Sequence, residues 1–281
     1  MKYIMAGTLY LCATPIGNLD DITFRVVKLM ESVDVIAAED TRNTLKLLNH
    51  FEIKTPMTSY HEHNKVTKGP VLVERMLAGE SIALVTDAGM PGISDPGADL
   101  VKLCYDAGVP VTVAPGASAA VVALVLSGLD TRRFVFEGFL PPDKKERRAI
   151  LKTLEREHRT MIFYEAPHKL LSTLEDLAEA FGEDRGISLC RELTKLHEEV
   201  VRTTLGEAVA KYTENPPKGE FVLVVAGAPA EEKEAASETD VASRVAQLMA
   251  EGLSRKDAVK QTAKELDLPK NVVYDIALKE E

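Results

Sequence analysis

The stretch that decides the fold class is 82-IALVTDAGMPGISDPG-97. It starts as a short apolar run and turns directly into a loop that holds three glycines and two prolines. Residues 81–86 are therefore predicted to form a strand, and residues 87–97 a loop at its carboxyl end. Ligands of open α/β sheets bind beyond the carboxyl ends of strands, and glycine lets backbone approach them closely. The loop is a candidate ligand-binding loop, with a structural turn as the alternative.

Similar apolar runs recur along the chain and alternate with helical patterns. In the first half, strands are expected at 8–12, 33–38, 81–86 and 111–114, and helices at 22–31, 44–50, 71–77, 98–107 and 117–126. In the second half, strands are expected at 134–139, 161–164, 187–191 and 221–226, helices at 144–157 and 168–180, and a polar or helical segment at 204–212. The alternation predicts α/β units, the first with a mainly parallel sheet.

The chain is therefore expected to form two α/β lobes with a cleft between them, followed by a small helical domain. The first lobe is expected at 1–116 and the second at 117–228, with a Pro/Ala-rich acidic linker at 229–239. Three short helices are expected at 240–281, the second capped by Ser254 with Asp257 three residues on. This pattern resembles a helix-turn-helix domain. A generic three-helix appendage or a dimerisation tail is the alternative.

The composition bounds the class of protein. The chain is 45% hydrophobic and 28% charged, and no apolar run approaches the roughly 18–20 residues that span a bilayer. The three cysteines, Cys12, Cys104 and Cys190, are widely spaced, which disfavours a disulfide framework and fits the reducing cytoplasm. The net charge of −10 opposes nucleic-acid binding unless basic residues are locally concentrated. No metal is expected, because the His61-Glu-His63 segment has no obvious third ligand.

Polar loops follow three other predicted strands. Residues 14–21 follow the first strand, 39–42 the second, and 115–120 the strand at 111–114. Together with 87–97, these loops are expected to converge on one crevice, because the carboxyl ends of parallel strands share one edge of a sheet. Glu39, Asp40 and Arg42 form either a local ion pair with a helix cap or an active-site group.

Eight segments of the chain resemble one known family when they are taken together. They are ATPIGNLDDIT, AAEDTRNT, HEHNK, TDAGMPGISDPG, PGASAA, FEGFLP, FYEAPHK and RELTKLHEE. They are similar to the ribosomal RNA small subunit methyltransferase I family of tetrapyrrole-methylase-like (class III) methyltransferases, over about residues 7–227. The resemblance implies a homodimer in which each cleft binds S-adenosylmethionine. It also implies 2′-O-methylation of a cytidine of 16S ribosomal RNA near the decoding centre of the small ribosomal subunit.

The resemblance also implies which residues contact the cofactor, by position in the matching segments. They are Pro15, Asp87, Ala88, Gly89, Met90, Ile93, Ser118, Ala119, Tyr164, Leu193, Ala226, Gly227 and Ala228.

Transfer to a ribose hydroxyl benefits from a general base. Glu39 and Asp40 are the first candidates and His61 is the reserve, while Arg42 is a candidate for binding a neighbouring phosphate. Lys195 is a candidate for holding a phosphate or lowering the pKa of the hydroxyl.

A basic cluster is the candidate RNA contact. Lys144, Lys145, Arg147 and Arg148 follow two prolines at the start of a predicted helix. Cations oppose the helix dipole there, so RNA phosphate is one explanation for them. A solvated helix start is the other.

Two rival functions remain open. Corrin and porphyrin methylases share the fold but carry a Gly-x-Gly-Pro-Gly-Asp-Pro type of segment on the first strand, where this chain has ATPIGNL at 13–19. A non-enzymatic helix-turn-helix regulator that uses the large domain as a ligand sensor is the second rival. The EDTR group at 39–42 beside the cleft speaks against it.

Overall fold

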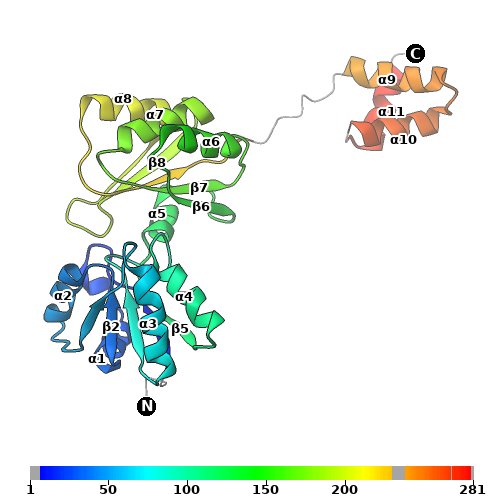
Figure 1. Ribbon diagram of the computed structural model, residues 1–281. Coiled ribbons are helices and arrows are strands. Elements are labelled where there is room, and N and C mark those ends of the chain that lie inside the picture. Colours follow the sequence, from blue (N-terminus) through cyan, green and yellow to red (C-terminus); the bar gives the residue numbers. More distant parts are fainter. Residues whose placement is uncertain (1–6, 230–237, 267, 280–281) are drawn as a thin grey trace. The chain divides into compact units, whose positions relative to one another are not determined.

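A computed structural model describes residues 7–229, 238–266 and 268–279. The chain divides into two compact units, Met1–Ala228 and Pro229–Glu281. Most of the linker expected at 229–239 falls on residues 230–237, outside the described residues. The first unit contains two lobes, each built on a five-stranded sheet (Figure 1).

The first lobe is a parallel sheet covered by helices on both faces. Its strand order is β3-β2-β4-β1-β5, and every pair is parallel. The strands are β1 Leu9–Cys12, β2 Val35–Ala38, β3 Met57–Ser59, β4 Ile82–Val85 and β5 Val111–Ala114. The helices are α1 Phe24–Ser32, α2 Thr41–His50, α3 Lys65–Leu77 and α4 Gly97–Asp106, with a 3-10 turn, η1, at Leu19–Asp21. The parallel sheet predicted for this half is confirmed.

Burial explains why these short segments form the sheet. All residues of β2 and β4 are buried, as expected for central strands covered on both faces. The core on one face includes Val26 of α1 and Leu48 of α2, and the core on the other includes Leu72 of α3 and Leu100 of α4. Thr23 caps α1 by accepting a hydrogen bond from the Val26 N–H.

The second lobe is a mixed sheet with the order β6-β7-β10-β8-β9. Only β6 and β7 are parallel, whereas β10 runs antiparallel to both β7 and β8, and β9 runs antiparallel to β8. The strands are β6 Phe134–Phe139, β7 Thr160–Glu165, β8 Gly186–Arg191, β9 Glu199–Thr204 and β10 Phe221–Val225. The helices are α6 Lys144–Leu154, α7 Leu170–Phe181 and α8 Leu205–Glu214, after α5 Ala119–Ser127, which links the lobes.

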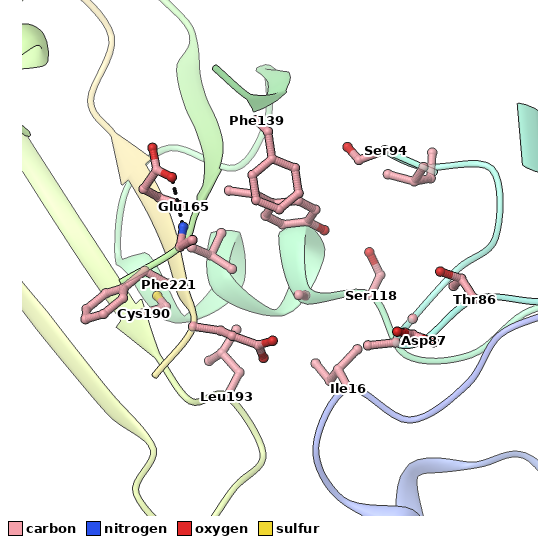
Figure 2. A pocket seen from close by; sticks show the side chains of 18 of the residues that line it. Ile16, Thr86, Asp87, Ser94, Ser118, Phe139, Glu165, Cys190, Leu193 and Phe221 are labelled. Atoms are coloured by element: carbon pink, nitrogen blue, oxygen red, sulfur yellow. Dashed lines mark hydrogen bonds between the residues drawn. The ribbon is translucent and has the colours of Figure 1, made fainter. Parts of the chain in front are cut away.

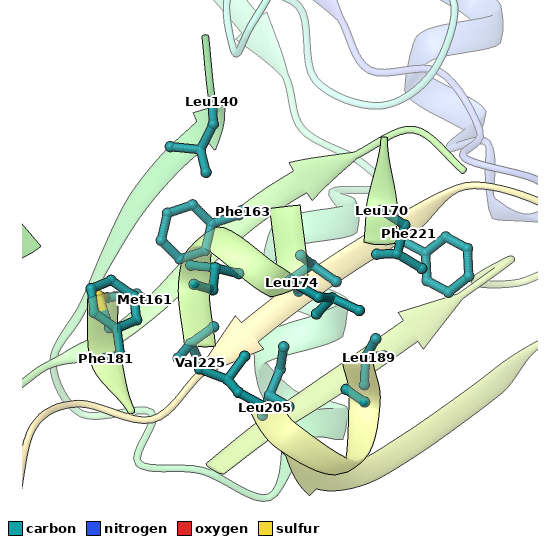
Figure 3. Packing of buried hydrophobic residues seen from close by; sticks show 14 of the residues in the cluster. Leu140, Met161, Phe163, Leu170, Leu174, Phe181, Leu189, Leu205, Phe221 and Val225 are labelled. Atoms are coloured by element: carbon teal, nitrogen blue, oxygen red, sulfur yellow. The ribbon is translucent and has the colours of Figure 1, made fainter. Parts of the chain in front are cut away.

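Helices cover both faces of this sheet (Figure 1). The larger core packs α6, α7 and α8 against one face and includes Phe163, Leu174 and Leu205, each fully buried (Figure 3). Helix α5 packs on the other face, where Leu124 meets Ile162 and Val224. This helix is apolar along its whole length, yet only one face is buried, since Val121 and Val125 are 52% and 68% exposed.

The C-terminal unit has its own apolar core. It consists of α9 Glu238–Ala250, α10 Arg255–Glu265 and α11 Lys270–Lys279. Ser254 caps α10 by accepting from the Asp257 N–H at 3.2 Å, so the cap predicted from the sequence is confirmed. Val259 and Val273 lie in the core. The neighbouring Val272 is 38% exposed.

Two strands were not predicted from the sequence, and both lie at sheet edges. β3 has three residues, and none of its residues is fully buried. β9 carries charged and threonine residues that alternate only weakly with apolar ones. Edge strands are half exposed, so their hydrophobic pattern is weak. The segment at 204–212 is resolved as helix α8 after a capping Thr204.

Candidate functional site

A cavity of about 540 Å³ lies between the lobes, at the carboxyl edge of the first sheet (Figure 2). This volume is in the range of small-molecule sites. The first lobe contributes loops after β1, β2 and β4 and the start of α5. The second contributes the ends of β6, β7 and β8 and the start of β10. A smaller cavity of about 280 Å³ adjoins it along residues 14–19 and shares Ile16, Asp87 and Lys195 with it.

The four polar loops of the first lobe converge here, as predicted. Thr14 and Gly89 form an isolated bridge through two backbone hydrogen bonds, of 2.9 and 3.1 Å. Asp87 accepts from the Asp40 N–H at 3.2 Å and from the Asn43 side-chain amide at 3.2 Å. The loops after β1, β2 and β4 are thus bonded directly to one another.

Glu39 is one of three first-lobe carboxylates that line the cavity, with Asp87 and Asp95. Its Oε2 accepts a 2.5 Å hydrogen bond from the Thr86 hydroxyl and a 3.2 Å bond from the Asp87 N–H. Both bonds use the same oxygen, which leaves Oε1 for a proton or a ligand. Burial raises the pKa of the neighbouring Asp87, and the charge of Glu39 adds to this effect.

Asp95 holds the glycine-rich loop in shape. Its carboxylate accepts from the Gly92 N–H at 2.9 Å and from the Gly97 N–H at 2.7 Å. Gly89 and Gly92 have φ of +84° and +91°, conformations that glycine adopts without strain. Burial raises the pKa of Asp95, although the bonds from the two glycines oppose the rise.

Asp40 and Arg42 form a helix cap and an ion pair at the edge of the site. Asp40 caps α2 by accepting from the Arg42 N–H at 2.8 Å, and its other oxygen lies 2.7 Å from Nη2 of Arg42. The hydrogen bonds from Arg42 lower the pKa of Asp40 to about 2. A carboxylate with this pKa is a weak proton acceptor, so the geometry favours Glu39 over Asp40 as the base. The Arg42 side chain is 87% exposed.

Lys195 is the cation on the second-lobe wall. Its Nζ lies 2.9 Å from Oε1 of Glu192 and 2.8 Å from Oε2 of Glu220. Burial alone would lower the pKa of Lys195, but the two glutamates outweigh it and raise the pKa. The ammonium is therefore charged near neutral pH.

Tyr164 ties the linking helix to the second lobe. Its hydroxyl accepts from the Ala120 N–H at 3.2 Å, in the first turn of α5. Ser118 occupies the N-cap position of α5 without a capping bond from its own side chain, within the described contacts. Its hydroxyl and the N–H groups of the first turn other than that of Ala120 are thus available to an anion.

Ten of the thirteen residues predicted to contact a cofactor line these cavities. Pro15 lines the smaller one, and the nine from Asp87 to Leu193 line the larger one. The remaining three lie at the other end of the strands of the second sheet, away from the cavity. They are Ala226, Gly227 and Ala228, and the N–H of Ala228 donates to the Glu157 carbonyl. The reason is that β10 is antiparallel to its neighbours. Its first residues, not the segment after its end, face the cavity.

Two further predicted groups are placed away from the cavity. His61 is not among the described residues that line either cavity. Its backbone N–H donates to the Asn64 side chain in the turn before α3. Arg147 is 7% exposed and donates to Asp176 at 2.6 Å and to the carbonyls of Pro141 and Pro142 at 3.2 Å. It holds α6 against α7 and is not presented to RNA, which corrects that prediction. Lys144 and Lys145 are exposed.

Several lining residues were not predicted. They are Thr86, Asp95, Phe139, Glu165, Glu192 and Glu220, among others. Thr86 and Asp95 lie close in the sequence to predicted cofactor residues, and Glu192 precedes Lys195 in the same segment. Proximity in the sequence to predicted site residues could therefore have identified all three. Glu220 precedes β10 and reaches the cavity only because that strand is antiparallel.

Among the residues that the structure describes, no group of three or more His, Cys, Asp or Glu is placed to hold a metal ion. In the same part of the chain, every helix is too short or too polar to cross a membrane.

Comparison with known proteins gives the class. Residues 8–209 match the family described as Tetrapyrrole (Corrin/Porphyrin) Methylases, and residues 235–281 match the RsmI C-terminal HTH domain. The structure is also similar to that of uroporphyrin-III-C-methyltransferase from Thermus thermophilus. The TM-score is 0.56 at 20% identity, with 78% of this chain and 94% of that chain covered, a likeness in fold alone. The fold and the cavity thus define a methyltransferase with the tetrapyrrole-methylase architecture.

Two curated relatives narrow this class. A protein of Synechocystis sp. named ribosomal RNA small subunit methyltransferase I is 52% identical, over 97% of this chain and 98% of its own length. A protein of Halalkalibacterium halodurans with the same name is 50% identical, over 96% and 94%. The chain belongs to the ribosomal RNA small subunit methyltransferase I family.

Proposed function

We propose that this methyltransferase transfers the methyl group of S-adenosylmethionine to the 2′-hydroxyl of a cytidine in 16S ribosomal RNA, near the decoding centre. The observation that carries the proposal is the cavity itself, with the Glu39 carboxylate on one wall and the Lys195 ammonium on the other. The names of the relatives support an RNA substrate.

The lining residues fit the chemistry of this methyl donor. Its sulfonium and ammonium groups are cationic, and the first-lobe wall carries Glu39, Asp87 and Asp95. Its carboxylate matches the Ser118 hydroxyl and the first-turn N–H groups of α5 that Tyr164 does not use. Its adenosyl group requires apolar surface, which Ile16, Leu193 and Val222 provide.

The reaction needs little covalent help from the protein. Bound S-adenosylmethionine supplies an activated methyl group on sulfur. Glu39 is the proposed acceptor of the ribose hydroxyl proton as the oxygen forms its bond to the methyl carbon. General-base help of this kind contributes about 10²–10⁴-fold, and alignment in a closed site contributes on the order of 7–11 kcal/mol in the best cases.

The charged groups on the second-lobe wall are proposed to orient the RNA. Lys195 is charged and held between two glutamates, so its position is fixed before substrate arrives. It is suited to a phosphate or to the developing negative charge on the ribose oxygen. Arg42 is exposed enough to bind a neighbouring phosphate, and the exposed Lys144 and Lys145 are the remaining candidates for more distant contact.

The net charge of −10 favours an assembled small subunit over free RNA as the substrate. A homodimer in the cytoplasm, with the C-terminal helical unit as an additional nucleic-acid contact, completes the proposal.

The test is methyl transfer from labelled S-adenosylmethionine to small subunits that lack the modification, followed by mapping of the label. Label at a cytidine ribose is the expected result. Label on a base, or label on free RNA but not on subunits, would contradict the proposal. Small subunits that already carry the modification are the control.

A further inference from the structure

An aromatic side chain lies exposed at the cavity, although the proposed chemistry gives it no role. Phe139, the last residue of β6, lines the cavity and is 58% exposed. Figure 2 shows its ring across the cavity from Ile16 and Leu193. Exposing so much of a phenylalanine ring forgoes part of the free energy that burial would provide.

A bulge in β6 aims this ring. The pairing of β6 with β7 shifts between Phe136 and Gly138, so that Glu137 is an extra residue. Side chains alternate along a strand, and residues three apart normally face opposite sides. With the extra residue, Phe136 and Phe139 both contact the Tyr164 ring, at centroid distances of 5.1 and 5.4 Å. Bulges often re-aim side chains beside active sites.

The segment on either side of the ring is held rigidly. Gly138 has φ of +66°, and a Cβ there would lie 3.0 Å from Oγ of Ser94 in the glycine-rich loop. Leu140 is 7% exposed and packs in the core (Figure 3). The buried Arg147 holds the carbonyls of Pro141 and Pro142, at 3.2 Å each. The exposed ring is therefore fixed in place before any ligand binds.

A fixed, exposed aromatic face at a cavity matches one ligand chemistry well, the planar face of a nucleobase. Single-stranded RNA is recognised largely by stacking of splayed-out bases on aromatic side chains. We propose that Phe139 stacks on the base of the nucleotide that is methylated. This inference rests on the proposed function, because it requires an RNA substrate.

The exposure of the ring favours the target base over the adenine of the methyl donor. A small ligand that fills the cavity binds among the more buried lining residues, such as Ile16, Leu193 and Val222. Phe139 is 58% exposed whereas these residues are at most 9% exposed, so its ring remains open to a substrate that approaches from solvent. Stacking needs no net positive charge on the protein, which suits a chain with a net charge of −10.

The first experiment measures methyl transfer against the concentration of unmodified small subunits. Phe139→Ala and Phe139→Leu are expected to lower kcat/KM by about 10- to 100-fold, as for the loss of one base–aromatic stack. Phe139→Tyr is expected to retain the wild-type kcat/KM. Phe134→Ala is the matched control, because Phe134 is on the same strand, is 43% exposed and is not among the described residues lining the cavity. Calorimetry with S-adenosylhomocysteine should show unchanged affinity in every variant, which also verifies folding.

The second experiment uses the absence of tryptophan from the sequence. Phe139→Trp introduces the single tryptophan of the chain at the proposed stacking position. Its fluorescence should be quenched when unmodified small subunits are added, and not by S-adenosylhomocysteine alone.

Quenching by S-adenosylhomocysteine alone would assign the ring to the adenine and overturn the proposal. Wild-type kcat/KM in both Phe139→Ala and Phe139→Leu would overturn it as well. Failure of the proposed function looks different, because the wild-type protein itself would then transfer no methyl group to the subunits.

Discussion

The first lobe lines the cavity only with the carboxyl ends of parallel strands, whereas the second lobe uses strands that run in both directions. The first-lobe wall is acidic and cross-bonded: Asp87 accepts from Asp40 and Asn43 after β2, and Asp95 accepts from Gly92 and Gly97 of its own loop. The second-lobe wall is acidic as well, with Glu165, Glu192 and Glu220, and differs by carrying Lys195 and an exposed aromatic ring, Phe139. This difference motivates the proposed division of roles, with proton acceptance on the first wall and substrate contact on the second.

The largest expected effect tests the first wall. Glu39→Gln should lower kcat by about 10²–10⁴-fold, because an amide cannot accept the hydroxyl proton. Donor affinity should fall far less than kcat, since the amide oxygen still accepts from Thr86 and the carboxylates of Asp87 and Asp95 remain. The measurement is single-turnover methyl transfer together with calorimetry.

Asp40→Asn is the matched control for Glu39→Gln. Asn caps helices as well as Asp does, so helix α2 should be preserved and turnover nearly unchanged. Normal turnover in Glu39→Gln combined with loss in Asp40→Asn would reverse the assignment of the base.

The next largest effect is expected on the stability of the second lobe rather than on activity. The Asp176 side chain is 2% exposed and pairs with Arg147, whose side chain is 9% exposed. Asp176→Ala should lower the free energy of unfolding by about 3–5 kcal/mol, because it leaves a buried guanidinium unpaired. Urea unfolding measures the change. Glu179→Ala is the control, because it removes an exposed partner of Arg148 and should cost about 0–1 kcal/mol.

This ion pair also predicts a pH dependence. Burial would raise the pKa of Asp176, but hydrogen bonds from Arg147 and Arg148 outweigh it and lower the pKa. A carboxyl whose pKa is lowered in the folded state contributes stability above its unfolded pKa, and that stability is lost as the pH falls through the folded value. Asp176→Ala should therefore flatten the loss of stability at acidic pH. An equally steep loss would show that other carboxylates dominate it.

A smaller effect is expected where the two walls touch. A Cβ on Gly17 would lie 2.5 Å from Cγ of Lys195 and 2.9 Å from the carbonyl oxygen of Leu193. Gly17→Ala should therefore separate the walls slightly, at a cost of about 1–3 kcal/mol, and weaken donor binding by about 10-fold. Gly186→Ala is the control, since its Cβ would meet only Ala226 at an ordinary 3.6 Å. Unchanged donor affinity would show that the cavity does not depend on this contact.

The smallest effect concerns the exposed lysines of α6. The double variant Lys144→Glu with Lys145→Glu should weaken binding to small subunits and reduce the salt slope by about 1–2, if these lysines contact phosphates. Lys152→Glu, near the end of the same helix, is the control. An identical slope in the double variant would confine RNA contact to the cavity and its rim.

The sequence was sufficient for the first-lobe part of the site. In a parallel sheet every strand ends at the same edge, so the order of strands and loops placed residues 14–21, 39–42, 87–97 and 115–120 together without coordinates. Ala226–Ala228 were assigned to the cofactor by the resemblance alone, and in the structure the segment after β10 lies away from the cavity because β10 is antiparallel to its neighbours. Strand direction in a mixed sheet depends on long-range pairing, which local sequence does not encode.

The basic cluster on α6 also shows that long-range packing decides what local sequence does not. Four neighbouring cations were expected to act alike, yet Arg147 is buried against Asp176, 29 residues away, while Lys144 is exposed. Which cation turns inward depends on where α7 packs, and no pattern within residues 144–148 carries that information.

By itself, the sequence determined the alternation of strands and helices, the Ser254 cap, the polar loops of the first lobe and the family. These features depend on local hydrophobic periodicity, on turn chemistry and on contiguous motifs. Only the tertiary structure decided which end of β10 meets the cavity, that Arg147 is buried, and that a bulge turns Phe139 toward the cavity. These features arise from strand pairing and helix packing between distant segments, whose free energies are shared by the whole fold rather than set by adjacent residues.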